Sequence, residues 1–334
     1  MKMHREADIH RLKFSFIIPA LNESVMLSRL LTSINNMNTS TLAEILEIIV
    51  IDAESTDQTV SIAQSYNCKV HTAKPGRVSI SRNIGAENAS GDVLAFIDAD
   101  CELPTDWLEK AAQELCQKQV IGVGFRMVEN PNSSSWVEEA WYELAHKEAP
   151  NTETSEVDWL ATFNLAIKKD AFKLAGGFDE NLETCEDVEL GYRLSTHGKL
   201  KRITSSGVIH HGESKTLSEF FRREAWRARG ASGIVKKHWT NPRELLSFLL
   251  PMVFIPSLAA SLGLFLFSLL GLINQEPSLA ILFAAIFLGP LPILLLVSRR
   301  KVKLSRLLHC SGLLCVYFLA RFQGTFKPFK RVER

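Results

Sequence analysis

The chain has 334 residues, which is long enough for one large domain or two ordinary ones with a buried core. Its formal net charge is only +1, but residues 299–334 hold ten Lys or Arg against one acid, so charge is strongly partitioned along the chain. The six cysteines form no C-x-x-C pair, which disfavours a disulfide framework and indicates reduced packing residues.

Strands and helices alternate over the first hundred residues. The first apolar run, residues 14–18, ends at Pro19 and is too short for the core of a signal peptide, so we expect this part in the cytosol. Repeating strand–helix units imply a parallel sheet with right-handed crossovers and helices on both faces. The apolar patterns predict strands at 14–19, 45–52, 70–72 and 93–98, and helices at 25–34, 58–66 and 78–88.

Polar residues follow three of these strands, at 19–23, 52–57 and 98–101. In a parallel sheet these strand ends share one edge, where ligands bind in open α/β folds. Asp98 and Asp100 offer hard oxygen ligands to Mg²⁺ or Mn²⁺ bridging substrate phosphates, although a solvated turn is the alternative.

The turn after the second predicted strand holds two acids. If Ser55 or Thr56 caps the next helix, Asp52 is left to accept hydrogen bonds from a ligand. Asp57 is alternatively a first-turn acid favoured by the helix dipole.

Arg82 follows a Pro-Gly-Arg turn and offers a guanidinium group to phosphate near the start of a helix. Neither G-x-G-x-x-G nor G-x-x-x-x-G-K-[ST] occurs, which disfavours a dinucleotide site and a P-loop. Further along, residues 159–167 lead to a predicted helix at 169–175, and a second helix is predicted at 188–197. His210 and His211 follow a last predicted strand at 207–209.

Together PALNE, IVIDAESTDQT, GRVSISRNIGAENASGDVLAFIDADC, AGGFDE and ETCEDVELGYRL resemble a family 2 glycosyltransferase, over roughly residues 13–235. The resemblance implies an α/β GT-A fold, with a Rossmann-like, mostly parallel central sheet and helices on both faces. It also implies that Asp52 meets the base of the nucleotide and that Arg82 lies over the base and ribose. The nucleotide-sugar site implied in this way comprises Pro19, Ala20, Asn22, Glu23, Asp52, Arg82, Asp98 and Asp100.

Asp98 and Asp100 correspond to the DXD element of the family, with Asp100 as the direct metal ligand and His210 or His211 as a further one. Ala53 is a departure, since many members carry a second acid there, and this weakens any inference about the base that is bound.

The resemblance gives the role of catalytic base to Asp187, the second acid of an ED pair. In an inverting transfer this carboxylate takes the proton of the acceptor hydroxyl. The competing interpretation is that Glu186 and Asp187 are simply favourable acids at a helix N-terminus. The acceptor and leaving-group region is expected to include Trp159, Gly177, Glu186, Arg222 and Arg223.

From Leu245 onward the composition becomes apolar, which predicts a membrane domain at 245–334. The cytosolic domain at 1–240 is then the glycosyltransferase domain that the resemblance implies. Residues 248–273 and 279–297 are uncharged and long enough to span a bilayer. The basic loop at 298–306 then predicts a multi-pass protein of the inner membrane with its catalytic domain in the cytoplasm. The third apolar stretch, 307–320, is either re-entrant, in-plane or spanning, and the basic tail 321–334 follows it.

We therefore expect an inverting hexosyltransferase of cell-envelope glycan synthesis that needs Mg²⁺ or Mn²⁺. It would use a nucleoside-diphosphate sugar, with a UDP-sugar favoured, and a lipid-linked acceptor at the membrane. Processive synthesis is disfavoured because Arg223-Glu224-Ala225-Trp226 lacks the Q-x-x-R-W pattern.

Other functional classes fit the sequence less well. A polyprenyl-phosphate glycosyltransferase is the first alternative, although CELPTDW lacks the Leu-Gln usual in such synthases. A non-catalytic nucleotide-sugar-binding membrane protein is the second, and the Glu186-Asp187 pair counts against it. Nucleic-acid binding is not expected, because aromatic residues are not interleaved with a basic face.

Overall fold

The computed structural model describes residues 11–146, 152–239, 241–270 and 304–326. The chain divides into two compact units. Of the described residues, the first unit comprises 11–130, 152–182 and 186–212, and the second comprises 131–146, 183–185, 213–239, 241–270 and 304–326. The predicted domain boundary near residue 240 stays a prediction.

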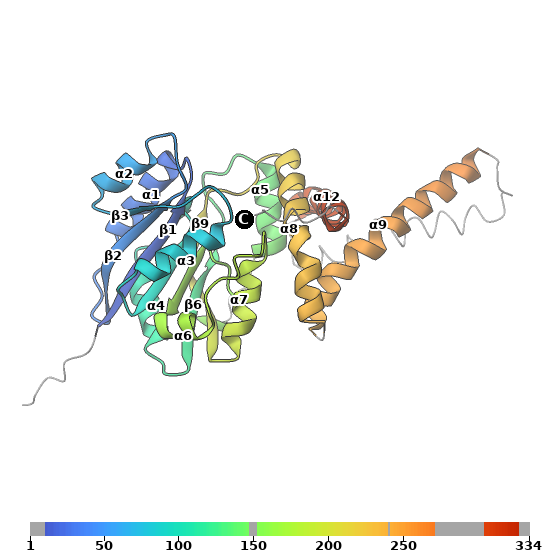
Figure 1. Cartoon of the computed structure of the whole chain (residues 1–334). Coiled ribbons are helices and arrows are strands. Elements are labelled where there is room, and N and C mark those ends of the chain that lie inside the picture. Colours follow the sequence, from blue (N-terminus) through green and yellow to red (C-terminus); the bar gives the residue numbers. More distant parts are fainter. Residues whose placement is uncertain (1–10, 147–151, 240, 271–303, 327–334) are drawn as a thin grey trace, which may run out of the picture. The chain divides into compact units, whose positions relative to one another are not determined.

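The first unit is built on one mixed β-sheet (Figure 1), with the strand order β3-β2-β1-β4-β8-β6-β9-β5 and with β7 beside β9. Strands β1, β2, β3 and β4 pair in parallel, as do β6 and β9. The strands are β1 Leu12–Ala20, β2 Ala43–Asp52, β3 Lys69–Thr72, β4 Val93–Ile97, β5 Cys101–Glu102, β6 Val120–Met127, β7 Thr154–Val157, β8 Asn164–Lys168 and β9 Lys199–His210.

The second half of the sheet departs from the predicted repetition of parallel strands. Strand β8 lies between β4 and β6 and runs antiparallel to both, while β5 and β7 pair antiparallel with β9. Antiparallel neighbours need no covering crossover helix between them, so this part of the chain does not repeat the strand–helix alternation that guided the sequence prediction.

Helices cover both faces of this sheet, as predicted. Alternate side chains of a strand point to opposite faces, so Phe16 joins the core under α1 and α4 whereas Ile17 joins the core under α3, α6 and α7. Trp107, fully buried, packs on the rings of Phe14, Phe16 and Phe125. The helices are α1 Ser24–Asn35, α2 Thr59–Ser65, α3 Val78–Asn88, α4 Trp107–Leu115, α6 Lys169–Leu174 and α7 Glu186–Ser195.

The second unit is helical and has its own core, which contains Phe220, Phe254, Leu313 and Phe318. Glu224, fully buried on α8, forms ion pairs with Arg227 at 2.6 Å and with Arg321 at 3.1 Å. Its helices are α5 Trp136–Trp141, the π-helix Tyr142–His146, α8 Leu217–Lys237, α9 Pro242–Leu269, the 3-10 helix Leu304–Arg306 and α12 Leu307–Thr325.

Within the described ranges, no helix is both long enough and apolar enough to cross a membrane. The predicted span at 248–273, of which residues 271–273 lie outside the described residues, is therefore not supported by α9. For 307–320, the spanning alternative is not supported by α12. The predicted span at 279–297 lies outside the described residues.

Candidate functional site

The candidate site begins where β1 and β2 end side by side. Ala20, the last residue of β1 after Pro19, pairs with Asp52 of β2, and the Ala53 amide donates to the Ala20 carbonyl at 2.9 Å. The Asp52 carboxylate is 4% exposed and accepts the Ser55 amide at 3.1 Å. This carboxylate is therefore held in place by its own turn.

The two loops that follow β1 and β2 are joined by hydrogen bonds. The Asn22 amide donates to the Ser55 hydroxyl and the Thr56 amide donates to the Asn22 side-chain oxygen, both at 2.8 Å. Asn22 adopts a left-handed backbone conformation with φ of 56°. The side-chain oxygen of Asn22 thus accepts a hydrogen bond from the neighbouring loop, a contact that the sequence did not predict.

The cap of α2 differs from the prediction. Neither Ser55 nor Thr56 is the N-cap, because this position belongs to Gln58. Asp57 instead accepts hydrogen bonds from the amide and hydroxyl of Thr59 and from the amide of Ser24. The Thr59 hydroxyl is the main cause that lowers the pKa of Asp57 to about 2. The Asp57-Gln58-Thr59 spacing, typical of an Asx turn, was the signal that could have identified this arrangement.

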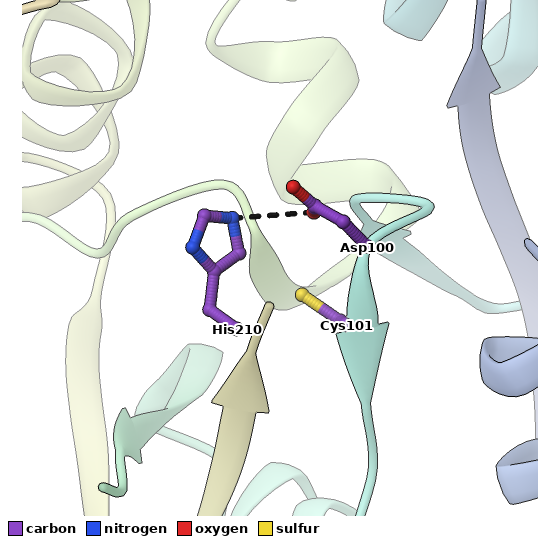
Figure 2. Close-up of side chains that lie close together, drawn as sticks. All are labelled: Asp100, Cys101 and His210. Atoms are coloured by element: carbon purple, nitrogen blue, oxygen red, sulfur yellow. Dashed lines mark ion pairs between the residues drawn. The ribbon is translucent and has the colours of Figure 1, made fainter. Parts of the chain in front are cut away.

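A possible metal site forms where β5 meets β9. Asp100, Cys101 and His210 each bring one potential ligand atom to a cluster in which these atoms lie within 4.8 Å of one another. Figure 2 shows the His210 ring facing the Asp100 carboxylate, with Nε2 3.2 Å from Oδ1. Cys101 pairs with His210 across the two strands, and its thiol donates to the Phe163 carbonyl at 3.3 Å.

The space around this cluster suits a divalent cation. Gly212 lies against the carboxylate of Asp100, and a β-carbon built on it would overlap the Oδ2 atom. A carboxylate oxygen beside an imidazole nitrogen is a donor set that Mg²⁺ and especially Mn²⁺ accept. The softer Cys101 thiol is instead hydrogen-bonded to the Phe163 carbonyl. The residues present therefore fit a divalent metal.

His211 has a different environment from His210. Its Nδ1 lies 3.0 Å from Nη1 of Arg29, and its Nε2 lies 3.0 Å from the Glu102 carboxylate. Because a guanidinium can only donate, Nδ1 accepts and Nε2 carries the proton donated to Glu102. Of the two histidines between which the sequence left the choice open, the structure brings His210 to Asp100.

The two acids of the predicted metal motif have different partners. Asp98 follows β4, and its Oδ1 accepts Nη2 of Arg82 at 2.7 Å. Asp98 is not among the residues whose ligand atoms cluster around His210. Asp100 is therefore the acid that lies beside His210, whereas Asp98 forms an ion pair with Arg82.

The Arg82 side chain is almost completely buried. It is 3% exposed, and Nη1 also donates to Glu186 at 2.8 Å. Burial lowers the pKa of Arg82, but the charges of Asp98, Glu186 and Asp187 outweigh this and raise it. Arg82 therefore stays charged beside the first turn of α7.

Helix α7 begins at Glu186, two residues earlier than predicted, so the ED pair lies in its first turn. The Val188 amide donates to the Asp187 carboxylate at 2.8 Å. Trp159 packs on the same helix, since a β-carbon on Gly191 would lie 2.6 Å from its Cα. The predicted base is thus on a helix that is held closely against the loop before β8.

Acidic side chains crowd the site around Glu23. Burial and the charges of Asp100, Asp57 and Asp98 raise the pKa of Glu23 to about 7. Such crowding indicates that carboxylates distant in sequence converge on one region, where a cation would reduce their repulsion.

Two predicted acceptor residues lie in the other unit. Arg222 and Arg223 belong to α8. Hydrogen bonds from the Lys215 and Thr216 amides, and then the charge of Arg222, lower the pKa of Glu219 on this helix. Gly177 lies in the first unit with φ of 73°, in the loop that precedes α7.

Part of this site lies in a region that matches a known family. Residues 15–174 match the profile described as Glycosyl transferase family 2. The chain is similar to the "Pre-mycofactocin glycosyltransferase" of Mycobacterium tuberculosis, with 27% identity over 66% of this chain and 47% of that protein. It is also similar to the "Dolichol-phosphate mannosyltransferase" of Pyrococcus furiosus, with 30% identity over 63% of this chain and 62% of that protein.

A solved structure shares the fold. The mannosyltransferase PcManGT of Pyrobaculum calidifontis, in complex with GDP-Man and Mn²⁺, superposes with a TM-score of 0.56. The likeness covers 95% of this chain and 87% of that one at 18% identity. The chain spans about half the length of the Mycobacterium relative, 47%. The likeness to the solved structure supports a GT-A-like α/β fold, and the family 2 glycosyltransferase profile matches residues 15–174.

Proposed function

We propose that this protein is a family 2 glycosyltransferase that moves a hexosyl group from a nucleoside-diphosphate sugar to an acceptor hydroxyl with inversion. One observation carries the proposal: Asp100, which lies within the region that matches the family, pairs with His210 and acts together with Asp57 and Asp98 on the carboxyl group of Glu23. A UDP-sugar remains the favoured donor, and Asp52 is the proposed contact to its base.

Asp187 is the proposed general base of the transfer. Its carboxylate takes the proton from the acceptor hydroxyl while the acceptor oxygen forms a bond to the anomeric carbon. The bond between that carbon and the diphosphate oxygen breaks, and its electron pair leaves with the nucleoside diphosphate. A divalent cation held by Asp100 and His210 would neutralise negative charge on this leaving group.

The proposed acceptor is a lipid-linked molecule at the cytoplasmic face of the inner membrane. It is supported by the apolar composition from Leu245 onward and by exposed apolar side chains on α9, such as Leu246, Val253 and Leu262. A polyprenyl phosphate is the second candidate acceptor, because one relative is named a dolichol-phosphate mannosyltransferase.

The decisive experiment compares turnover and binding in Asp187→Asn. We expect this variant to lose release of nucleoside diphosphate while its affinity for UDP with Mn²⁺ stays unchanged, because amide and carboxylate have the same shape. Asp170→Asn is the matched control, since Asp170 is an exposed first-turn acid of α6 and should keep full turnover. Wild-type turnover in Asp187→Asn would reject the assignment of the base.

The donor and acceptor are identified in two steps. A thermal-shift panel of UDP- and GDP-sugars with Mn²⁺ selects the donor, because a tight ligand stabilises the folded form by mass action. Release of nucleoside diphosphate is then measured with a membrane lipid extract and with a polyprenyl phosphate. Donor binding without release in either mixture would favour a nucleotide-sugar-binding protein over an enzyme.

A further inference from the structure

The buried guanidinium group of Arg82 links two parts of the site that are far apart in the sequence. Arg82 lies on α3, and its two terminal nitrogens bind Asp98 after β4, at 2.7 Å, and Glu186 at the start of α7, at 2.8 Å. The ring of Phe178 lies 5.7 Å from the guanidinium carbon. With its side chain 3% exposed, Arg82 has both terminal nitrogens committed to protein carboxylates.

The next residue of α3 holds the loop that leads to α7. The Asn83 side chain accepts the Phe178 amide and donates to the Phe178 carbonyl, both at 3.0 Å. It also donates to the Glu180 carboxylate at 3.0 Å. Two consecutive residues of α3 therefore fix the approach to α7 and its first turn.

We propose that Arg82 is a positioning residue that sets the place of Asp187 relative to the donor side of the site. The inference rests on the proposed function, in which Asp187 is the base, and differs from the expectation that Arg82 covers the nucleotide. Arg82 binds Glu186, the neighbour of Asp187 in the first turn of α7, and ties that turn to the strand end that carries Asp98.

The planar guanidinium is suited to this task. Its fork presents two separate N–H groups to two carboxylates in fixed directions, whereas the ammonium of lysine is a point charge on a flexible stem. Lysine at this position would keep the charge but could not hold both Asp98 and Glu186 in the same geometry. The first turn of α7 would then be free to shift.

The first test is Arg82→Lys in the full chain. A misplacement of about 1 Å can lower a rate roughly 100-fold, so we expect kcat to fall about 10- to 100-fold while the Kd of UDP with Mn²⁺ stays unchanged. Arg306→Lys is the matched control, because Arg306 also joins two acids, Glu139 at 3.0 Å and Glu143 at 3.3 Å, in the second unit. A wild-type kcat in Arg82→Lys, or a loss confined to the Kd of UDP, would overturn the proposal.

Chemical rescue separates positioning from general loss of structure. In Arg82→Ala, millimolar guanidinium chloride should enter the space left by the side chain and restore part of kcat in a saturable manner. The same salt should give no gain in Arg306→Ala. Absence of rescue in a variant that still binds UDP with Mn²⁺ would count against the role assigned to the guanidinium.

Two further measurements keep the test decisive if Arg82 variants fold poorly or if the wild type transfers no sugar. Glu186→Gln weakens one half of the link without leaving a buried cation alone, and it should lower kcat with UDP binding retained. Hydrogen exchange is independent of turnover: the first turns of α7 should exchange faster in Arg82→Lys than in the wild type. Unchanged exchange there would reject the proposal, whereas a wild type without turnover would reject only the proposed function.

Discussion

Asp100 needs space beside its carboxylate, and Gly212 provides it. A β-carbon at this position would overlap Oδ2 of Asp100 and lie 3.4 Å from Cε1 of His210. We therefore expect Gly212→Ala to displace the carboxylate and to weaken Mn²⁺-dependent binding of UDP by roughly 10- to 100-fold. Isothermal titration with and without Mn²⁺ measures this effect.

Gly233 on α8 is the matched control for that substitution. Nothing lies within 4 Å of a β-carbon built there, so Gly233→Ala should leave UDP binding unchanged and stabilise its helix by about 0.5–1 kcal/mol. Equal affinity for UDP in Gly212→Ala and the wild type would show that the Asp100 cluster does not hold the metal.

Glu47 is a buried acid inside β2. Its carboxylate accepts the Ser15 hydroxyl at 2.7 Å, the Ser90 amide at 2.6 Å and the Lys69 ammonium at 2.6 Å. Burial raises the pKa of Glu47, but these hydrogen bonds outweigh it and lower the pKa. Glu47→Gln should therefore cost about 1–3 kcal/mol of unfolding free energy near pH 7.

The sign of the pH dependence follows from the lowered pKa. The ionised Glu47 stabilises the fold above the pKa of the unfolded chain, and this stabilisation is lost as pH falls through the folded pKa. The difference between wild type and Glu47→Gln in urea unfolding should thus shrink in acid. Glu44→Gln, at an exposed pair with Arg11, is the control and should change stability by about 0–1 kcal/mol.

At the scale of elements, the close contact between α7 and Trp159 decides where the first turn of the helix lies. A β-carbon on Gly191 would lie 2.6 Å from the Cα of Trp159, so Gly191→Ala must push the helix away from this backbone. We expect kcat to fall about 10- to 100-fold while the affinity for UDP with Mn²⁺ is kept. Steady-state kinetics and titration measure the two quantities.

Ser195→Ala, at the exposed end of the same helix, should behave like the wild type. A Gly191→Ala enzyme with undiminished kcat would mean that the position of α7 does not govern the transfer.

At the scale of the whole molecule, the two units have separate cores. In the described residues, the first unit has one apolar core on each face of its sheet. The second unit has an apolar core around Phe220 and Phe318. UDP with Mn²⁺ at 100 times its Kd should stabilise the first unit by about 2.7 kcal/mol. Scanning calorimetry should show this as a shift of the transition that hydrogen exchange assigns to the first unit, and EDTA should reverse it. A transition that ignores both UDP and Mn²⁺ would contradict the proposed site.

Local patterns were sufficient to predict much of the first unit. The apolar period identified β1, β2, β3 and β4, and α3 begins and ends where the sequence predicted, at Val78 and Asn88. Each of these elements has a pattern that a short window of the sequence contains, such as the continuous apolar run of β4. Strand β6, by contrast, was missed, and the antiparallel entry of β8 depends on pairing between residues far apart in the chain.

The sequence by itself determined the strand ends that carry Asp52, Asp98 and Asp100 and a helix that begins directly after Asp187, because hydrophobic periodicity and short polar turns are local properties. Only the tertiary structure decided which side chains meet. His210 lies beside Asp100, and His211 lies between Arg29 and Glu102. Arg82 forms ion pairs with Asp98 and Glu186. These partners are separated by up to 182 residues, so their pairing is fixed by strand register and helix packing, which no local pattern encodes.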